Sequence, residues 1–209
     1  AIDFVTTVAP GLRDVLLTGK IKERIIHTDK QGNRVYDAVV VDAPPTGRIG
    51  NFLDVTQAMA DLAKTGPIRN QSEGVVRLLH SEETIIHLVT LLEAMPIQET
   101  IEAIDELRGK NLNLGSLVIN RVSEPHLPAE VIDEIAEGRV DAGRVEDGLT
   151  AAGLKLADGD LAGLLTETIE HATRLQAQQI AKAQLDEVEM PTLELPSVGD
   201  GVDLGSIYE

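Results

Sequence analysis

The sequence YDAVVVDAPPTG, at residues 36–47, carries the strongest structural signal in the chain. Its first seven residues are mostly aliphatic and β-branched, without an alternation of apolar and polar side chains. That pattern is typical of a parallel strand covered on both faces. The run ends on a carboxylate, Asp42, and a stiff proline-containing turn follows at 44–47. We therefore expect a buried strand that delivers a carboxylate to the carboxyl edge of a parallel sheet, where open α/β sheets bind ligands.

Other short aliphatic runs alternate with stretches of helical periodicity. The pattern predicts three further strands, at 84–90, 115–120 and 191–195. Apolar residues at helical spacing predict three helices, at about 11–28, 49–64 and 97–109. Strands that alternate with helices predict an α/β fold with a doubly wound, mainly parallel sheet.

The stretch at about 121–189 is much longer than one crossover requires. Its strongest pattern is a stripe of Leu and Ala between Leu161 and Leu175, which predicts a helical insertion. Residues 122–190 hold 5 basic and 15 acidic side chains, against 13 and 16 in residues 1–121. Two interpretations of this acidity stay open, a solvated outer face or an interaction surface for a cationic or amphipathic partner.

Composition excludes several classes of function. A net charge of −17 opposes binding to phosphate backbones, so nucleic acid is not expected as a partner. The absence of Cys removes disulfides and thiol chemistry and fits a cytoplasmic protein. No apolar run approaches the length that spans a bilayer, so an integral membrane protein is not expected either.

The turn after Asp42 has the residue types of a phosphate-responsive loop. In phosphate-handling enzymes, an Asp at a strand end holds Mg²⁺, usually through water, and a following Gly such as Gly47 senses the terminal phosphate. The alternative is a proline-rich turn that caps the next helix, with Asp42 bonded to nearby backbone amides.

Two other strand ends carry candidate ligand-binding residues. Asn120 offers a donor and an acceptor to a base edge, although an Asx turn explains it equally well. Leu195 and Pro196 form an apolar, rigid edge suited to packing on a flat ring, or an ordinary strand exit.

Several common motifs are absent from the sequence. No GxxxxGK[ST] occurs, because Gly19-Lys20 has Asp14 at the first glycine position and is followed by Ile21. The five histidines show no metal-ligand spacing, and neither G-x-S-x-G nor GxGxxG is present. Hydrolase and dehydrogenase interpretations therefore have no motif to support them.

Taken in order, these segments resemble the anion-transporting ATPase family, most closely its actinobacterial branch. That family includes the arsenite-pump ATPase and the ATPases that target tail-anchored membrane proteins. The resemblance covers nearly the whole chain and rests on residues 9–11, 42–47 with 52–53, 89–93 with 99–100, 118–120 and 193–196.

The resemblance implies a P-loop NTPase-like fold that binds ATP and Mg²⁺. Asp42 resembles the family's Mg²⁺-side carboxylate, acting through water. The implied switch residues are Asp42, Pro44, Pro45, Thr46 and Gly47. The implied nucleotide-binding residues are Thr46, Gly47, Asn120, Arg121, Leu195 and Pro196.

The resemblance also implies partners. They are a related ATPase subunit, in a homo- or hetero-dimer, and a membrane-protein or peptide client. The cysteine pair that binds zinc between subunits in some family members is missing, so a zinc-clasped dimer is not expected.

The chain also departs from the family pattern. The phosphate loop and the first switch loop, with the catalytic residues, are expected upstream of Ala1. Residues 1–209 then form one incomplete nucleotide-binding domain, without its N-terminal βαβ portion and with a helical insertion at about 121–189. The segment Pro10-Gly11-Leu12-Arg13-Asp14 lacks the family's usual acidic pair.

Three hypotheses follow from these motifs and departures. The first is an ATPase whose hydrolysis cycle moves the loop after Asp42. The second is a non-catalytic partner-binding module or inactive relative, suggested by the missing phosphate loop. The third is a partition-type or iron-protein-type relative, although the absent cysteines count against the iron-protein version.

Overall fold

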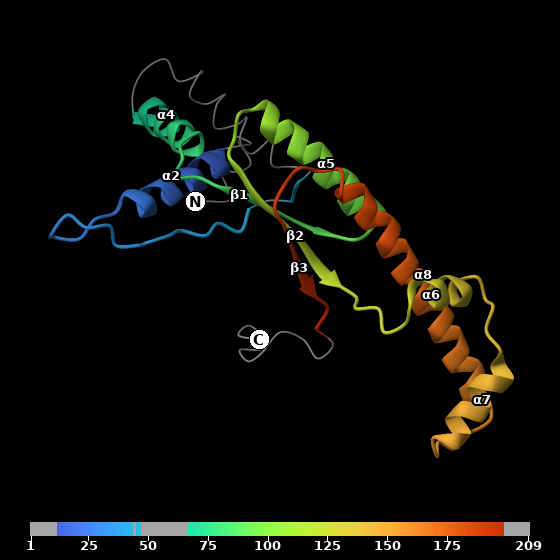
Figure 1. Ribbon diagram of the computed structural model, residues 1–209. Coiled ribbons are helices and arrows are strands. Elements are labelled where there is room, and N and C mark those ends of the chain that lie inside the picture. The colour runs from blue at the N-terminus through green and yellow to red at the C-terminus, as the bar shows by residue number, and fades with distance from the viewer. Residues whose placement is uncertain (1–11, 44, 47–66, 199–209) are drawn as a thin grey trace. The chain divides into compact units, whose positions relative to one another are not determined.

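The computed structural model describes residues 12–43, 45–46 and 67–198 (Figure 1). The elements in these ranges are, in chain order, α2 (Leu12–Ile26), α4 (Pro67–Leu79), β1 (Ile86–Leu91), α5 (Ala94–Gly109), β2 (Leu114–Val122), α6 (Ala129–Ala136), α7 (Ala142–Ala151), α8 (Asp160–Leu185) and β3 (Thr192–Pro196). The chain is therefore an α/β protein. It divides into two compact units, residues 1–88 with 99–116 and residues 89–98 with 117–209.

The three described strands form one sheet in the order β1-β2-β3, and β2 pairs in parallel with β3 (Figure 1). Helix α5 connects β1 to β2, and α6, α7 and α8 lie in the crossover from β2 to β3. The expected strands at 84–90, 115–120 and 191–195 and the helical insertion are confirmed, with strand bounds that differ by at most two residues.

The prediction of a strand at residues 36–42 is wrong. The backbone there forms no strand, and the side chain of Val40 is 96% exposed. An extended segment becomes a strand only when a neighbouring strand takes up its backbone N–H and C=O groups. No described residue pairs with this segment. The expected helix at 49–64 lies outside the described residues, and α4 was not anticipated from the sequence.

Helix α5 has one buried face, as its sequence predicts. The buried side chains Ile97, Thr100, Ile104 and Leu107 recur every three or four residues. The helix ends where Asn111 adopts a left-handed backbone conformation, with φ of 54°. The Leu112 N–H then reaches back to the Leu107 carbonyl at 3.1 Å, a bond that satisfies a carbonyl left open at a helix end.

The strand side chains are buried in alternation. Leu88 and Thr90 of β1 are buried, and so are Leu117 and Ile119 of β2, whereas Val89 is 59% exposed. One face of β1 is thus covered by the described residues.

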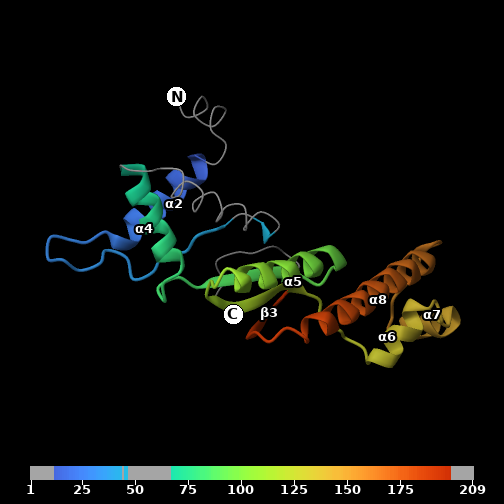
Figure 2. The ribbon, with the colours of Figure 1, turned by 90° about the horizontal axis from the view of Figure 1, so that it is seen from above.

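Helices α2 and α4 pack against each other (Figure 2). After α2 the chain forms a short antiparallel hairpin, in which Thr28 bridges to Arg34. At its tip, the Asp29 carboxylate accepts bonds from the backbone N–H groups of Asn33 and Gln31 at 2.9 and 2.8 Å. These bonds, led by that of Asn33, hold the Asp29 pKa below its ordinary value. A local Asx-type turn therefore fixes the hairpin.

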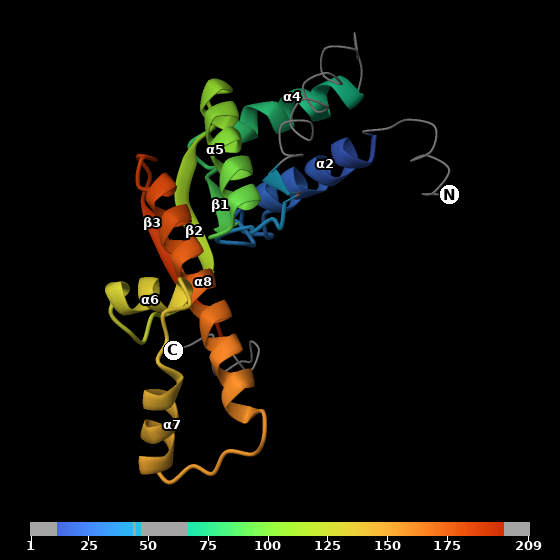
Figure 3. The same cartoon turned by 90° about the vertical axis from the view of Figure 1, so that its right-hand side faces the viewer.

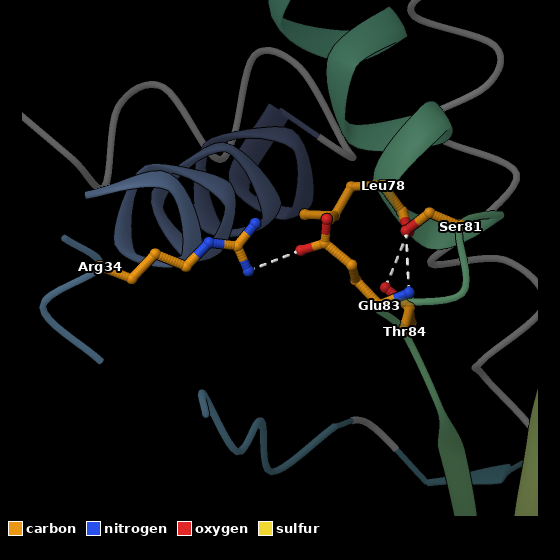
Figure 4. Close-up of polar contacts among 5 residues, drawn as sticks. All are labelled: Arg34, Leu78, Ser81, Glu83 and Thr84. Atoms are coloured by element: carbon orange, nitrogen blue, oxygen red, sulfur yellow. Dashed lines mark hydrogen bonds and ion pairs between the residues drawn. The ribbon is translucent and has the colours of Figure 1, made fainter. Parts of the chain in front are cut away.

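The turn between α4 and β1 closes the end of α4 (Figure 4). The Leu78 carbonyl accepts hydrogen bonds from the hydroxyls of Ser81, at 2.7 Å, and Thr84, at 2.8 Å. In the same turn, Glu83 forms an ion pair with Arg34 of the hairpin at 2.8 Å. The Arg34 guanidinium, through its hydrogen bond and then its charge, lowers the pKa of Glu83. Side chains thus satisfy a helix-end carbonyl and tie the hairpin to the start of β1.

The helical insertion is built on α8 (Figure 3). Ile132 of α6 is buried against Ala172 and Leu175 of α8, and the Gln176 side-chain amide donates to Asp133 at 3.0 Å. Helix α7, in contrast, has no buried residue, and its N-terminus is capped by its own preceding residue, Asp141. The core of the insertion is therefore the α6–α8 contact.

Candidate functional site

The pairing of β2 with β3 is interrupted at the carboxyl ends of the two strands. Ile119 pairs with Glu194, and the next pair is Val122 with Pro196. Between these pairs, two residues of β2 face one residue of β3. That two-against-one count defines a β-bulge, a feature often found beside functional sites because it redirects side chains.

The three residues at the bulge are Asn120, Arg121 and Leu195. Arg121 adopts the left-handed conformation, with φ of 57°, which is uncommon for a residue other than glycine. We call Asn120, Arg121, Leu195 and Pro196 the bulge edge. The structure thus brings together the four residues that the sequence singled out on these two strands.

The Asn120 side chain makes a local hydrogen bond. Its oxygen accepts the backbone N–H of the next residue, Arg121, at 2.9 Å. An Asx turn would instead use the N–H two residues on, so this bond does not correspond to that alternative. A carboxamide oxygen has a second lone pair, and the amide nitrogen carries two donors. The local bond therefore orients Asn120 and leaves it hydrogen-bonding capacity for a base edge.

The rest of the bulge edge is open. Leu195 is 41% exposed, Pro196 and Arg121 are exposed, and Asn120 is half-buried. A flat ring placed on Leu195 and Pro196 would cover apolar surface, which favours binding by the hydrophobic effect. The bulge edge also carries a planar cation, the guanidinium of Arg121.

The residues of the expected switch lie in the other compact unit. Asp42 is exposed on an irregular segment, Pro45 is exposed and Thr46 is half-buried. Pro44 and Gly47 lie outside the described residues. The functional roles of all these residues therefore stay predictions.

A Mg²⁺ ion bound through Asp42 is consistent with the chemistry of this segment. Mg²⁺ usually keeps several waters and takes one or two carboxylates together with substrate phosphates, so an exposed carboxylate suits it. Across the described parts of the chain, no three His, Cys, Asp or Glu side chains gather into an all-protein metal site. A single exposed carboxylate is thus compatible with an ion that is shared with a phosphate.

Similarity to known proteins agrees with the motifs. ATPase BagA of Mycobacterium tuberculosis is 62% identical over 209 residues, which is 100% of this chain and 62% of that protein. An Aquifex aeolicus protein named for an arsenical pump-driving ATPase is 23% identical over 157 residues, covering 63% of this chain and 50% of that protein. The ATPase ASNA1 homolog of Entamoeba dispar is 25% identical over 146 residues, with 54% and 43% covered.

The resemblance to the anion-transporting ATPase family is confirmed. The chain spans 62% of the length of its mycobacterial relative. No family model matches it. These relatives are named as ATPases. Among the described helices, none combines the length and the apolar character that a membrane crossing requires.

Two residues that contact the strands beside the bulge edge were not predicted from the sequence. Lys182 of α8 forms an ion pair with Glu194 of β3 at 2.6 Å, and the Gln178 side chain accepts the Ser123 N–H at 3.2 Å. The signal in the sequence is the spacing of Gln178 and Lys182, four residues apart on one helix.

Proposed function

We propose that this chain is part of an ATP-binding and ATP-hydrolysing protein that couples hydrolysis to a conformational change. The observation that carries the proposal is the bulge edge, where Asn120 and Arg121 meet Leu195 and Pro196. Relatives named as ATPases support the reaction class. The chain would thus contribute the base-binding edge and a switch loop to a P-loop NTPase-like site.

Each residue has a distinct task in this proposal. Asn120 hydrogen-bonds the adenine edge, Arg121 lies beside it, and Leu195 and Pro196 pack on the ring face. Asp42 holds a water of the Mg²⁺ ion, which when bound neutralises charge on the phosphates. The switch residues that follow the terminal phosphate are Pro44, Pro45, Thr46 and Gly47.

The phosphate loop must come from other sequence. No GxxxxGK[ST] occurs in these 209 residues, and the chain spans 62% of the mycobacterial relative. We therefore assign the phosphate loop and the residue that positions the attacking water to the part of the protein that the 209 residues do not contain. Positive charge at the phosphates would come from that loop and from Mg²⁺, since the chain itself is acidic.

Hydrolysis by the purified full-length protein tests the proposal. We expect release of phosphate from ATP that requires Mg²⁺ and is lost when the phosphate loop is replaced. No release above background, with or without candidate partners, would contradict it.

A second candidate function is a non-catalytic module that holds a partner through the helical insertion. The absence of a phosphate loop from the 209 residues favours it. Calorimetric titration of the full-length protein with MgATP separates the two, because a non-catalytic module requires no nucleotide affinity. Mg²⁺-dependent binding would support the ATPase, and its absence would favour the module.

The proposed partners follow from the family resemblance. They are a related ATPase subunit, in a homo- or hetero-dimer, and a membrane-protein or peptide client. Light scattering with and without MgATP tests dimerisation, and an unchanged monomer mass in both conditions would contradict a nucleotide-bridged dimer.

A further inference from the structure

Two side chains of α8 contact the strands on either side of the bulge. The Gln178 oxygen accepts the backbone N–H of Ser123, which follows directly after β2, at 3.2 Å. The Lys182 Nζ lies 2.6 Å from a carboxylate oxygen of Glu194, which directly precedes Leu195. Residues four apart share one face of a helix, so a single surface of α8 holds both strand ends.

The same helix also holds the insertion. One turn before Gln178, Leu175 packs in the cluster with Ile132 of α6, and Gln176 donates to Asp133 at 3.0 Å. Helix α8 runs without interruption from Asp160 to Leu185 (Figure 3). A continuous helix transmits rotation and translation between its two contact surfaces because its backbone bonds keep it rigid.

The bulge needs such support. A bulge removes regular ladder bonds between the two strands, and the unpaired residue depends on other contacts for its position. Ala181 and Leu185 are buried on α8, close to the two polar contacts, so the helix is anchored there by packing as well. The contacts of Gln178 and Lys182 thus fall where the ladder is weakest.

We infer that Gln178 and Lys182 are positioning residues that hold the bulge edge in its base-binding geometry and connect it to α6 of the insertion. This inference rests on the proposed ATP site. A partner that displaces α6 would then change the affinity for the base through α8. The coupling would be reciprocal, because linkage requires nucleotide to alter partner affinity by the same factor.

The test compares Lys182→Met and Gln178→Leu with a matched control in the full-length protein. We expect each variant to bind MgATP about two- to fivefold more weakly and to discriminate less between MgATP and MgGTP. Binding of inorganic tripolyphosphate should not change, because it has no base. The control Lys20→Met breaks an exposed pair with Glu23 on α2 and should change none of these affinities.

Exchanging the charges tests whether the ion pair itself, and not the Lys182 side chain alone, holds the bulge edge. Lys182→Glu alone should weaken MgATP binding, and Lys182→Glu with Glu194→Lys should restore most of it, since the pair is re-formed with reversed sign. Variants that bind MgATP and MgGTP like the wild type, or lose tripolyphosphate binding equally, would overturn the inference.

Hydrogen exchange without nucleotide separates failure of the inference from failure of the proposed function. We expect faster exchange at the Ser123 and Ser197 amides in Gln178→Leu and Lys182→Met. If the wild type binds no nucleotide, the ATP site is wrong and the inference falls with it, while faster exchange would still show that α8 supports the strands. Unchanged exchange at both amides would overturn the inference whatever the affinities.

Discussion

The backbone N–H of Ser197 donates a hydrogen bond to the carbonyl oxygen of Val122 at 2.9 Å. This bond lies just beyond the bulge, and the pairing of Ile119 with Glu194 lies just before it. The two strands are thus joined on both sides of the residues that depart from the ladder. The bulge is therefore a fixed part of the sheet and not the frayed end of a strand.

The backbone conformation of Arg121 gives a prediction about stability. Its φ of 57° suits glycine and disfavours β-branched residues. We expect Arg121→Val to be less stable than Arg121→Gly by about 1–2 kcal/mol. Urea unfolding of both variants measures the difference. Equal free energies of unfolding would mean that residue 121 does not adopt the left-handed conformation in solution.

Asp42 gives a prediction about activity. Its side chain is exposed on an irregular segment, so Asp42→Asn should retain the fold. If the carboxylate holds a water of Mg²⁺, hydrolysis of ATP by the full-length protein should fall by about a hundredfold or more. The matched control is Asp37→Asn, in the same exposed segment, which should keep wild-type activity. A variant of Asp42 that melts early would show instead that the residue is structural.

The α6–α8 contact gives a prediction about the insertion. Ile132 is 1% exposed in this contact, whereas its neighbour Val131 is 38% exposed. Ile132→Ala should destabilise the insertion by about 2–4 kcal/mol, because it leaves a cavity. Val131→Ala should cost less than about 1 kcal/mol. Hydrogen exchange of the α6 and α8 amides measures the loss of stability in each variant. Equal protection in the two variants would contradict the packing of Ile132 between α6 and α8.

The Arg34–Glu83 pair gives a prediction about pH. Arg34 lowers the pKa of Glu83, first through a hydrogen bond and then through its charge. The stabilisation from the pair is fully present above the ordinary pKa of a glutamate and is lost as the pH falls through the lowered value. Both side chains are about half exposed, so the effect is small and weakens with salt.

Thermal melting of the wild type and Glu83→Gln tests this at several pH values. The variant should melt at a lower temperature at about pH 7, and the difference should shrink as the pH falls below the ordinary pKa of a glutamate and through the lowered pKa of Glu83. A difference that persists in acid would show that Glu83 acts through something other than its charge.

Much of the fold follows from sequence periodicity. The stripe on α5 and the aliphatic runs of β1, β2 and β3 predict those elements because burial imposes a period on the chain. The helical insertion is likewise visible from its apolar stripe. The expected strand at residues 36–42 failed for a physical reason, since its pattern records a preference for burial, and a strand also needs a neighbour to pair with.

The candidate site was only partly predictable. Asn120, Arg121, Leu195 and Pro196 are visible as strand-end residues, but the bulge depends on register, which no local pattern specifies. Gln178 lies 55 positions from its partner Ser123, so only the tertiary fold brings these two residues together. The pair of Lys182 with Glu194 likewise depends on how α8 packs beside β3. Helix α4 was not predicted although its sequence is amphipathic, because most of its apolar residues lie in its last five positions, 75–79, and Gly74, a poor helix former, lies within it.

Photoaffinity labelling of the full-length protein with a base-azido ATP analogue and Mg²⁺ identifies the residues that contact the base. We expect the label on peptides containing Asn120–Val122 or Leu193–Ser197, and we expect excess ATP to suppress the labelling. Labelling confined to other peptides, or labelling that excess ATP leaves unchanged, would contradict the assignment of the bulge edge as the base-binding surface.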